Sequence, residues 1–488
     1  MSISQTIKNI LNQQGVFVLL VLVLVFLFSF SFFGEKIPLN DGAGYDGTFY
    51  YSVAQNFSTD FFENAYDRFR IFRIFPFFLI NLFFSIFSIE PSHANLMYSM
   101  YVLHYLNLAI QLTFFFKLAR LNNWKKTTTS IIFACFFFNY FTLKNFGYEI
   151  FQTDAFATTI FLVSFYYLQQ KNIFLALSIS FLGLITWPTV SYTIWLLYIF
   201  NKPFPQDGLR LNFITGKLVS IVFPLLSIGA VVTLYVLHKQ AILESMLCMQ
   251  AYLPFLITNA CAWSVFLYIL FRHCNYNIYC PHKKNLSIPW KKITSIAIPF
   301  LAINIFFRMY ANNEFFFNEA AFALQILLRP LKYPLITLIG HISYFGILPM
   351  LVLILFRHLL KDVFHRTVGY TIAFVAFLFF ATDSEARHIL PQIPLALVPL
   401  ASLLDKMNLN VKSVSALIVL QLVLSHFYLP INADGLAEAI ESNNFYTVAQ
   451  RYFMSFGPWM SFHTYIVWAA ISVFTAILVC QIIKKRKI

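Results

Sequence analysis

The sequence predicts an all-α protein, a polytopic transmembrane helical bundle with about 12–14 spans. Two features of its composition point there: 59% of the 488 residues are hydrophobic and only 11% are charged, whereas soluble proteins average about 25% charged residues. The third feature is a series of apolar runs of about 18 or more residues, the length that an α-helix needs to cross the hydrocarbon layer. No stretch resembles a separate soluble domain, so we expect residues 1–488 to form a single membrane-embedded domain.

The apolar runs give the expected order of helices. The first, over 15–34, follows a short polar leader and lacks a small-residue cleavage site, which indicates an uncleaved helix. The other expected helices cover 95–117, 127–146, 153–170, 172–187, 188–201, 214–238, 250–271, 292–309, 333–356, 367–382, 388–404, 412–429 and 462–484. The short fifth and sixth helices meet at Trp187 and Pro188, and the charge pattern downstream favours two helices over one broken helix.

Charge predicts the orientation. With the N-terminus in the cytoplasm, about two thirds of the 34 Lys and Arg residues fall inside and most of the 20 acidic residues fall outside. Both termini are therefore expected in the cytoplasm, with 35–94 and 430–461 as the first and last extracytoplasmic loops. We expect a multi-pass protein of a bacterial inner, or cytoplasmic, membrane. The net charge of +14 resides mostly in short cytoplasmic loops, so no nucleic-acid partner is expected.

One apolar segment does not fit this predicted orientation. Residues 71–89 are apolar enough to span, but counting them as a span would move the basic residues of 117–126 outside. The segment also contains Pro76 and directly follows three arginines. We therefore expect an interfacial helix in the first outer loop, or a re-entrant piece shielded by protein.

The first outer loop contains the best candidates for catalysis. Asp41 and Asp46 stand five residues apart within the stretch from Asn40 to Tyr51, where glycines allow tight turns and a close approach to a ligand. A carboxylate near the membrane boundary, shielded from water, has the raised pKa that suits a general base. The alternative is an ordinary polar loop with turn residues.

Three arginines follow in the same loop, against the orientation bias. Arg68, Arg70 and Arg73 are spaced to line one edge of a helix or turn, and a guanidinium cluster at headgroup depth suits a phosphate. The alternative is that they simply reach toward lipid headgroups.

Two further outer elements carry charge. Asp154 would stand at a helix N-terminus, where it is either a substrate ligand or an N-cap in competition with Thr153. Glu385, Arg387 and His388 crowd a very short loop with Asp383. They either bind substrate or form an ion pair that ties the loop down.

The sequence predicts no metal site. The six cysteines are scattered and indicate neither disulfides nor a redox motif. His273, Cys274, Cys280 and His282 lie close together in the sequence, but their spacing fits no common zinc motif.

These features together resemble the C-type (GT-C) glycosyltransferases, in which an uncleaved first helix precedes an acidic outer loop, interfacial helices and a polytopic body. The stretch from Tyr45 to Ala54 resembles the Trp-Asp-x-x-x-(aromatic)-x-x-(Ile/Val)-Ala motif of the GPI mannosyltransferase group and its bacterial relatives. The arginines ending at Pro76, the stretch 118–121 and Glu385-x-Arg387 are also similar. The sequence departs in having Tyr45 in place of Trp and no Asp-x-Asp, which leaves the sugar and metal dependence open.

The resemblance implies a membrane glycosyltransferase that moves a sugar, with inversion, from a polyprenyl-phosphate donor to a glycan, lipid or protein acceptor on the extracytoplasmic face. Asp46 or Asp41 would take the acceptor proton. Arg387 and one of the loop arginines would stabilise the departing lipid phosphate. The remaining substrate contacts are expected from Tyr45, Arg68, Arg70, Arg73, Asp154, Glu385 and His388. The requirement for a divalent cation stays open, and no other cofactor is expected.

Two other classes fit parts of the pattern. A transporter or lipid flippase would place ionisable residues near the bilayer midplane, and the expected spans contain almost none. An envelope polysaccharide polymerase or ligase of a different fold would also use outer arginines on lipid phosphate, without needing the paired aspartates. The place where the largest cavity opens discriminates between them: an outer-leaflet cavity lined by Asp46 indicates the transferase, whereas a central cavity that alternates between sides indicates the transporter.

Overall fold

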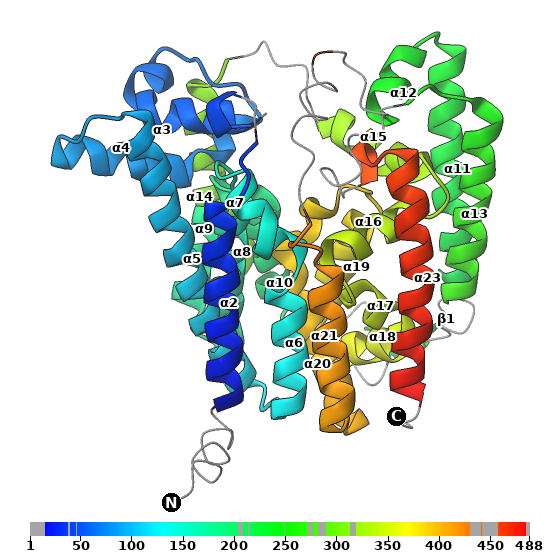
Figure 1. The fold of residues 1–488 in the computed structure, drawn as a ribbon. Helices are drawn as coiled ribbons and strands as arrows, with labels where there is room; N and C mark the ends of the chain where they lie inside the picture. Colours follow the sequence, from blue (N-terminus) through cyan, green and yellow to red (C-terminus); the bar gives the residue numbers. More distant parts are fainter. Residues whose placement is uncertain are drawn as a thin grey trace, which may run out of the picture.

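The all-α prediction is confirmed over the part of the chain that the structure describes. This computed structural model describes residues 15–37, 40–44, 46–203, 208–212, 215–247, 249–271, 277–281, 289–312, 319–429, 441 and 457–484. These residues form a bundle of helices, most of which run alongside α2 (Figure 1). A short antiparallel ribbon adds to it, in which β1 (Gly208–Asn212) pairs with β2 (Asn277–Pro281).

Six helices in the described region are long and apolar enough to cross a membrane. They are α2 (Gly15–Phe33), α5 (His93–Leu121), α13 (Leu253–Phe271), α14 (Trp290–Met309), η6 with α20 (Ala386–Gln392 and Ile393–Met407) and α23 (Phe462–Lys484). Several turn large apolar side chains outward, among them Phe26 on α2 and Ile298 on α14. Soluble proteins rarely expose such continuous apolar faces. The chain is therefore a multi-pass membrane protein.

Shorter elements fill the bundle and its ends. The helices are α3 (Gly47–Phe62), α4 (Phe75–Phe87), α6 (Lys126–Phe137), α7 (Phe146–Tyr148), α8 (Asp154–Gln169), α9 (Ile173–Leu184), α10 (Pro188–Ile199), α11 (Thr215–Val236), α12 (Gln240–Leu247), α15 (Glu319–Leu328), α16 (Ile336–Phe345), α17 (Leu348–Ile354), α18 (Phe356–Phe364), α19 (Val368–Phe380) and α21 (Val411–Leu424). Short turns are η1 (Asn40–Gly42), η2 (Arg70–Arg73), η5 (Arg329–Leu331), η8 (Gly457–Trp459) and the π-helical η3 (Phe141–Asn145).

Two expected helices are broken, and one buried glutamine explains how. The helix expected over 333–356 divides into α16, α17 and the start of α18, and the one expected over 127–146 ends as an α-helix at Phe137. Gln421 of α21 accepts a bond from the Ile347 N–H at 2.8 Å and donates to the carbonyls of Phe345 (3.1 Å) and Phe138 (2.8 Å). Breaks inside a membrane protein need such partners, because no water is there to replace the lost helical bonds.

The helix pair at Trp187 and Pro188 is confirmed as two helices. Ser180 of α9 accepts a bond from the Ser191 hydroxyl of α10 at 2.6 Å, and its own hydroxyl accepts from Trp195 Nε1 at 3.0 Å. Residues on either side of the turn therefore meet, so α9 and α10 form an antiparallel hairpin. Proline in the first turn of α10 suits this restart, because its missing N–H is not needed there.

The segment after the arginines forms a short helix. α4 has 13 residues, about 20 Å of helix, against a hydrocarbon core of about 30 Å. Figure 1 shows it lying across the end of the bundle beside α3, at a steep angle to α5. Asn81 ties it to α3 by donating to the carbonyls of Ala54 and Gln55.

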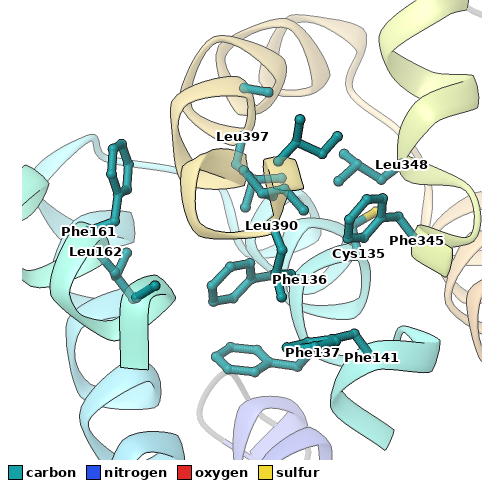
Figure 2. Packing of buried hydrophobic residues seen from close by; sticks show 14 of the residues in the cluster. Cys135, Phe136, Phe137, Phe141, Phe161, Leu162, Phe345, Leu348, Leu390 and Leu397 are labelled. Atoms are coloured by element: carbon teal, nitrogen blue, oxygen red, sulfur yellow. The ribbon is translucent and has the colours of Figure 1, made fainter. Parts of the chain in front are cut away.

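The buried centre fixes the elements that carry the site. Nearly every side chain of α8 is buried, and the helix packs against α5, α9, α10 and η6. In Figure 2, Leu390 of η6 and Leu397 of α20 lie near Phe136 of α6 within the same hydrophobic cluster. Close packing of this kind leaves little freedom for the polar residues at the ends of these elements.

The contact between α2 and α7 makes Gly147 sensitive to substitution. A Cβ at Gly147 would lie 2.2 Å from the Ser31 carbonyl oxygen, whereas a Cβ at Gly229 of α11 would meet nothing within 4 Å. We expect Gly147→Ala to lower the stability by about 1–3 kcal/mol, because the two backbones must separate. Thermal unfolding in detergent measures this. Gly229→Ala is the control and should be neutral or stabilising, and an unchanged midpoint for Gly147→Ala would contradict the packing.

Candidate active site

A cavity of about 230 Å³ gathers charged and aromatic side chains from distant parts of the chain. Its walls come from the loop after α2, the start of α3, η2, the turn between α7 and α8, the α9–α10 turn, η6 and η8. The lining residues are Ala43, Asp46, Gly47, Tyr50, Arg73, Glu149, Phe151, Gln152, Thr153, Asp154, Trp187, Arg387 and Trp459. Three carboxylates and two guanidinium groups therefore share one space.

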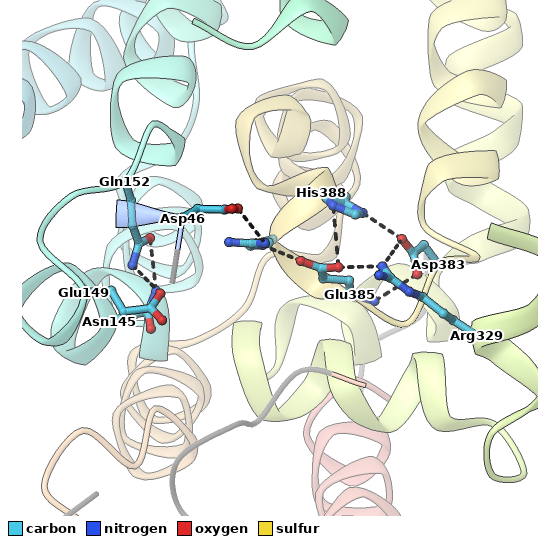
Figure 3. Close-up of polar contacts among 9 residues, drawn as sticks. Asp46, Asn145, Glu149, Gln152, Arg329, Asp383, Glu385 and His388 are labelled. Atoms are coloured by element: carbon cyan, nitrogen blue, oxygen red, sulfur yellow. Dashed lines mark hydrogen bonds and ion pairs between the residues drawn. The ribbon is translucent and has the colours of Figure 1, made fainter. Parts of the chain in front are cut away.

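Asp46 lies between two arginines. It immediately precedes α3, but its side chain makes no capping bond to that helix. Instead, Arg70 Nη2 donates to Asp46 Oδ1 at 3.0 Å, and Arg387 Nη2 lies 3.9 Å from Oδ2. The carboxylate thus connects the first loop to η6 while it lines the cavity (Figure 3).

Arg387 is held by a buried chain of opposite charges. Its Nε donates to Glu385, which also accepts from Arg329. Arg329 in turn lies 3.3 Å from Asp383, which also pairs with His388 Nδ1 at 2.7 Å (Figure 3). Burial raises the pKa of Glu385, but Arg387, His388 and Arg329 outweigh this and hold it well below its usual range. Glu385 is therefore a fixed anion that positions the cavity arginine.

The loop of 383–388 is thus tied by ion pairs, and Arg387 additionally faces the cavity. The ligand atoms of Asp383, Glu385 and His388 lie within 4.8 Å of one another, close enough to share a metal ion. Arg329 already supplies positive charge to both carboxylates there.

The three loop arginines take different positions. Arg73 lines the cavity with its guanidinium over the rings of Phe69 and Trp187, 4.2 Å from each ring centroid. Arg70 reaches Asp46, as described above. Arg68 is exposed and does not line the cavity. The structure therefore brings two of the three to the site.

Glu149 adds a carboxylate that the sequence did not predict for the site. Gln152 donates to Glu149 Oε2 at 2.8 Å and accepts from Asn145 at 3.2 Å (Figure 3). Burial raises the pKa of Glu149 to about 7, against the opposing effect of Arg387. The group therefore titrates near neutrality.

Asp154 is the most isolated of the three carboxylates. It is the first residue of α8, whose N-cap is Thr153, and no side-chain capping bond forms there. The N-cap interpretation of Asp154 is therefore wrong. Its side chain is only 2% exposed, and Oδ1 has no hydrogen-bond partner within the described residues.

The remaining predicted residues lie elsewhere. Asp41 is exposed, adopts a left-handed backbone conformation (φ 52°) and does not line the cavity. Tyr45 lies outside the described residues, as do His273, Cys274, His282 and most of 430–461. His388 does not line the cavity, and its ring centroid lies 6.2 Å from that of Trp187.

Sequence reasoning missed several cavity or network residues, including Glu149, Trp187, Arg329 and Trp459. A signal existed for two of them. Trp187 marks a helix break, and Glu149 stands five residues before Asp154 in an outer turn. Nothing in the local sequence distinguishes Arg329 or Trp459.

Comparisons with protein-family models, with curated proteins and with solved structures found no match to this chain.

The raised pKa of Glu149 predicts a pH-dependent stability. Between its ordinary value of 4.5 and about 7, the folded protein binds the proton more tightly than the unfolded chain, so stability falls as pH rises. Glu149→Gln cannot titrate and keeps an oxygen for Gln152. Its unfolding midpoint should therefore rise relative to wild type from about pH 5 to about pH 8.

Thermal unfolding of both proteins across this pH range provides the measurement. Glu63→Gln makes the same change at an exposed position at the end of α3 and should show no such trend. A difference between Glu149→Gln and wild type that is independent of pH would contradict the assignment.

Proposed function

We propose that this protein is a membrane glycosyltransferase that moves a sugar, with inversion, from a polyprenyl-phosphate donor to an acceptor hydroxyl. The observation that carries the proposal is the cavity in which Asp46, Glu149 and Asp154 share one space with Arg73 and Arg387. Sugar transfer from a lipid phosphate needs both kinds of group, a carboxylate for the acceptor proton and cations for the departing phosphate.

A second cavity supports a lipid-linked donor. It has a volume of about 460 Å³ and an almost wholly apolar lining from α13, α16, α17, α18, α19, η6 and α20. Thr382 and Ile389 line it, while Arg387, between them in sequence, lines the charged cavity. One short segment therefore separates the two spaces. An isoprenoid chain in the apolar cavity would place its phosphate near Arg387, and each buried CH₂ contributes about 0.8 kcal/mol.

The proposed reaction follows from these positions. The acceptor oxygen attacks the anomeric carbon from the face opposite the phosphate, so the new bond forms with inverted configuration. The bond between the anomeric carbon and the phosphate oxygen breaks, and its electron pair leaves with the lipid phosphate. Arg387 and Arg73 stabilise that charge, and planar guanidinium groups suit phosphate oxygens. A cavity carboxylate receives the acceptor proton. Asp46 is the sequence-predicted candidate, and Asp41 lies outside the cavity.

The proposal includes an extracytoplasmic site in a GT-C-like bundle of about 12–14 spans, with α4 at the membrane interface. The start of α2 and the end of α23 lie at one end of the bundle and α3 and α4 at the other (Figure 1), which supports cytoplasmic termini. The larger of the two cavities is the apolar one, which Asp46 does not line, so cavity size does not favour the transferase. A transporter or flippase receives less support because the charged cluster adjoins the loop after α2 rather than the middle of the long helices. A polysaccharide polymerase or ligase would differ in its product.

The topology is testable with single cysteines in a protein whose native cysteines are replaced. Ser58→Cys on α3 and Ser92→Cys before α5 should both react with an impermeant thiol reagent in intact cells, because 35–94 is expected outside. Lys126→Cys, exposed at the start of α6, is the control and should react only after the membrane is opened. Labelling of Ser58→Cys alone would mean that 71–89 spans the membrane.

The anion site is testable by comparing two arginines. Arg73→Lys should raise the KM for the polyprenyl-phosphate sugar by about tenfold, because Lys cannot reproduce the stacked planar fork. Arg68→Lys makes the same change at an exposed loop position and should leave the KM unchanged. Transfer of radiolabelled sugar from a panel of donors by the reconstituted protein gives both values. Equal changes in KM at the two positions would mean that Arg73 has no specific role in donor binding.

A further inference from the structure

The three cavity carboxylates differ in the groups that already pair with their oxygen atoms. Both oxygens of Asp46 face guanidinium groups, Arg70 at 3.0 Å and Arg387 at 3.9 Å. Glu149 accepts the amide of Gln152 at 2.8 Å. Asp154 alone has a buried oxygen, Oδ1, that accepts from no described residue. Buried polar atoms nearly always have a partner, so an exception at a cavity wall indicates a missing ligand group.

The surroundings of Asp154 specify what that ligand group is. Burial disfavours the ionised form of Asp154, and the positive charges of Arg387, Arg73 and His388 oppose that effect. A carboxylate only accepts hydrogen bonds, so the missing partner is a donor. The proposed transfer brings one neutral donor to this cavity, the hydroxyl of the acceptor.

We propose that Asp154 is a catalytic residue: it binds the acceptor hydroxyl and receives its proton, while Asp46 is a positioning residue that acts through Arg387. This assignment rests on the proposed transfer function. It replaces Asp46, the sequence-predicted base, with a cavity-lining carboxylate whose buried Oδ1 has no partner among the described residues.

The proton movement balances without any other reagent. As the acceptor oxygen bonds to the anomeric carbon, its O–H bond breaks and the proton passes to Asp154 Oδ1. The electron pair of the broken glycosyl–phosphate bond leaves on the lipid phosphate, near Arg387. Asp154 then returns the proton to water as the products leave. Asp46 keeps its contacts with Arg70 and Arg387 and so fixes the cation that the phosphate meets.

Azide distinguishes a proton acceptor from a positioning residue, because this anion attacks carbon without losing a proton. The wild type, Asp154→Asn and Asp46→Asn would be reconstituted with a panel of radiolabelled polyprenyl-phosphate sugars. Each would receive either a panel of alkyl glycosides or azide as the acceptor. Transfer to hydroxyl and formation of glycosyl azide are then measured separately. Asp60→Asn, a carboxylate that bonds Ser52 outside the cavity, is the matched control.

We expect Asp154→Asn to lower transfer to hydroxyl acceptors by about 100-fold or more, the range of a lost general base, and to retain glycosyl azide formation within about threefold of wild type. Asp46→Asn should lower both reactions in parallel, because it disturbs the phosphate site that both use. If Asp46→Asn alone spares the azide reaction, Asp46 is the base and the assignment is reversed.

Other outcomes separate the two proposals. Equal loss of both reactions in Asp154→Asn, with a normal unfolding midpoint, would make Asp154 a binding or structural residue and overturn the assignment while the transferase proposal stands. If the variant is unfolded, Asp154→Glu keeps the carboxylate and must restore hydroxyl transfer for the assignment to survive. A wild type that is inactive with every donor, toward hydroxyls and azide alike, would overturn the proposed function itself.

Discussion

The geometry of the candidate site depends on the buried ion pairs around Glu385. This carboxylate joins Arg387, which faces the cavity, to Arg329 of η5, which also contacts Asp383. Removing charges from water costs several kcal/mol per ion, so a buried network gives little net stability. It does make any displacement costly, because each charge that moves loses its partners. The network therefore fixes where Arg387 lies, and Asp46 adds a further carboxylate beside that guanidinium.

Around these charges, the walls of the cavity are aromatic. Trp187, Trp459 and Phe151 line it, and the guanidinium of Arg73 lies over the rings of Trp187 and Phe69. Apolar walls keep the local dielectric low, so charge interactions are stronger there than in water. The same surroundings give the carboxylates distinct properties. Glu149 titrates near neutrality, whereas Glu385 remains ionised within its cations.

The sequence predicted the helical class and most helices, because apolar periodicity and length are local properties. It also selected Asp46, Arg73, Asp154 and Arg387, which the structure places at one cavity. It did not separate Asp46 from Asp41, two similar residues in one loop, because only the fold turns one of them inward. The break between α16 and α17 was not evident, since the apolar pattern continues through it and Gln421, whose side chain bonds the backbone there, is 74 residues from Ile347 in sequence. Contacts made across such distances leave no local pattern.

The Gln421 side chain also holds two separate backbone segments at once. Its amide nitrogen bonds both Phe345, whose side chain lines the apolar cavity, and Phe138, which precedes the π-helical turn that carries Asn145 toward Gln152 and Glu149. If the backbone at Phe345 shifts, the Gln421 amide must either follow it or lose that bond, and following it would strain the bond to Phe138. The Gln421 side chain therefore connects the wall of the apolar cavity to the turn that supports the charged cavity. A lipid chain that displaced the wall at Phe345 would also disturb the backbone before Asn145.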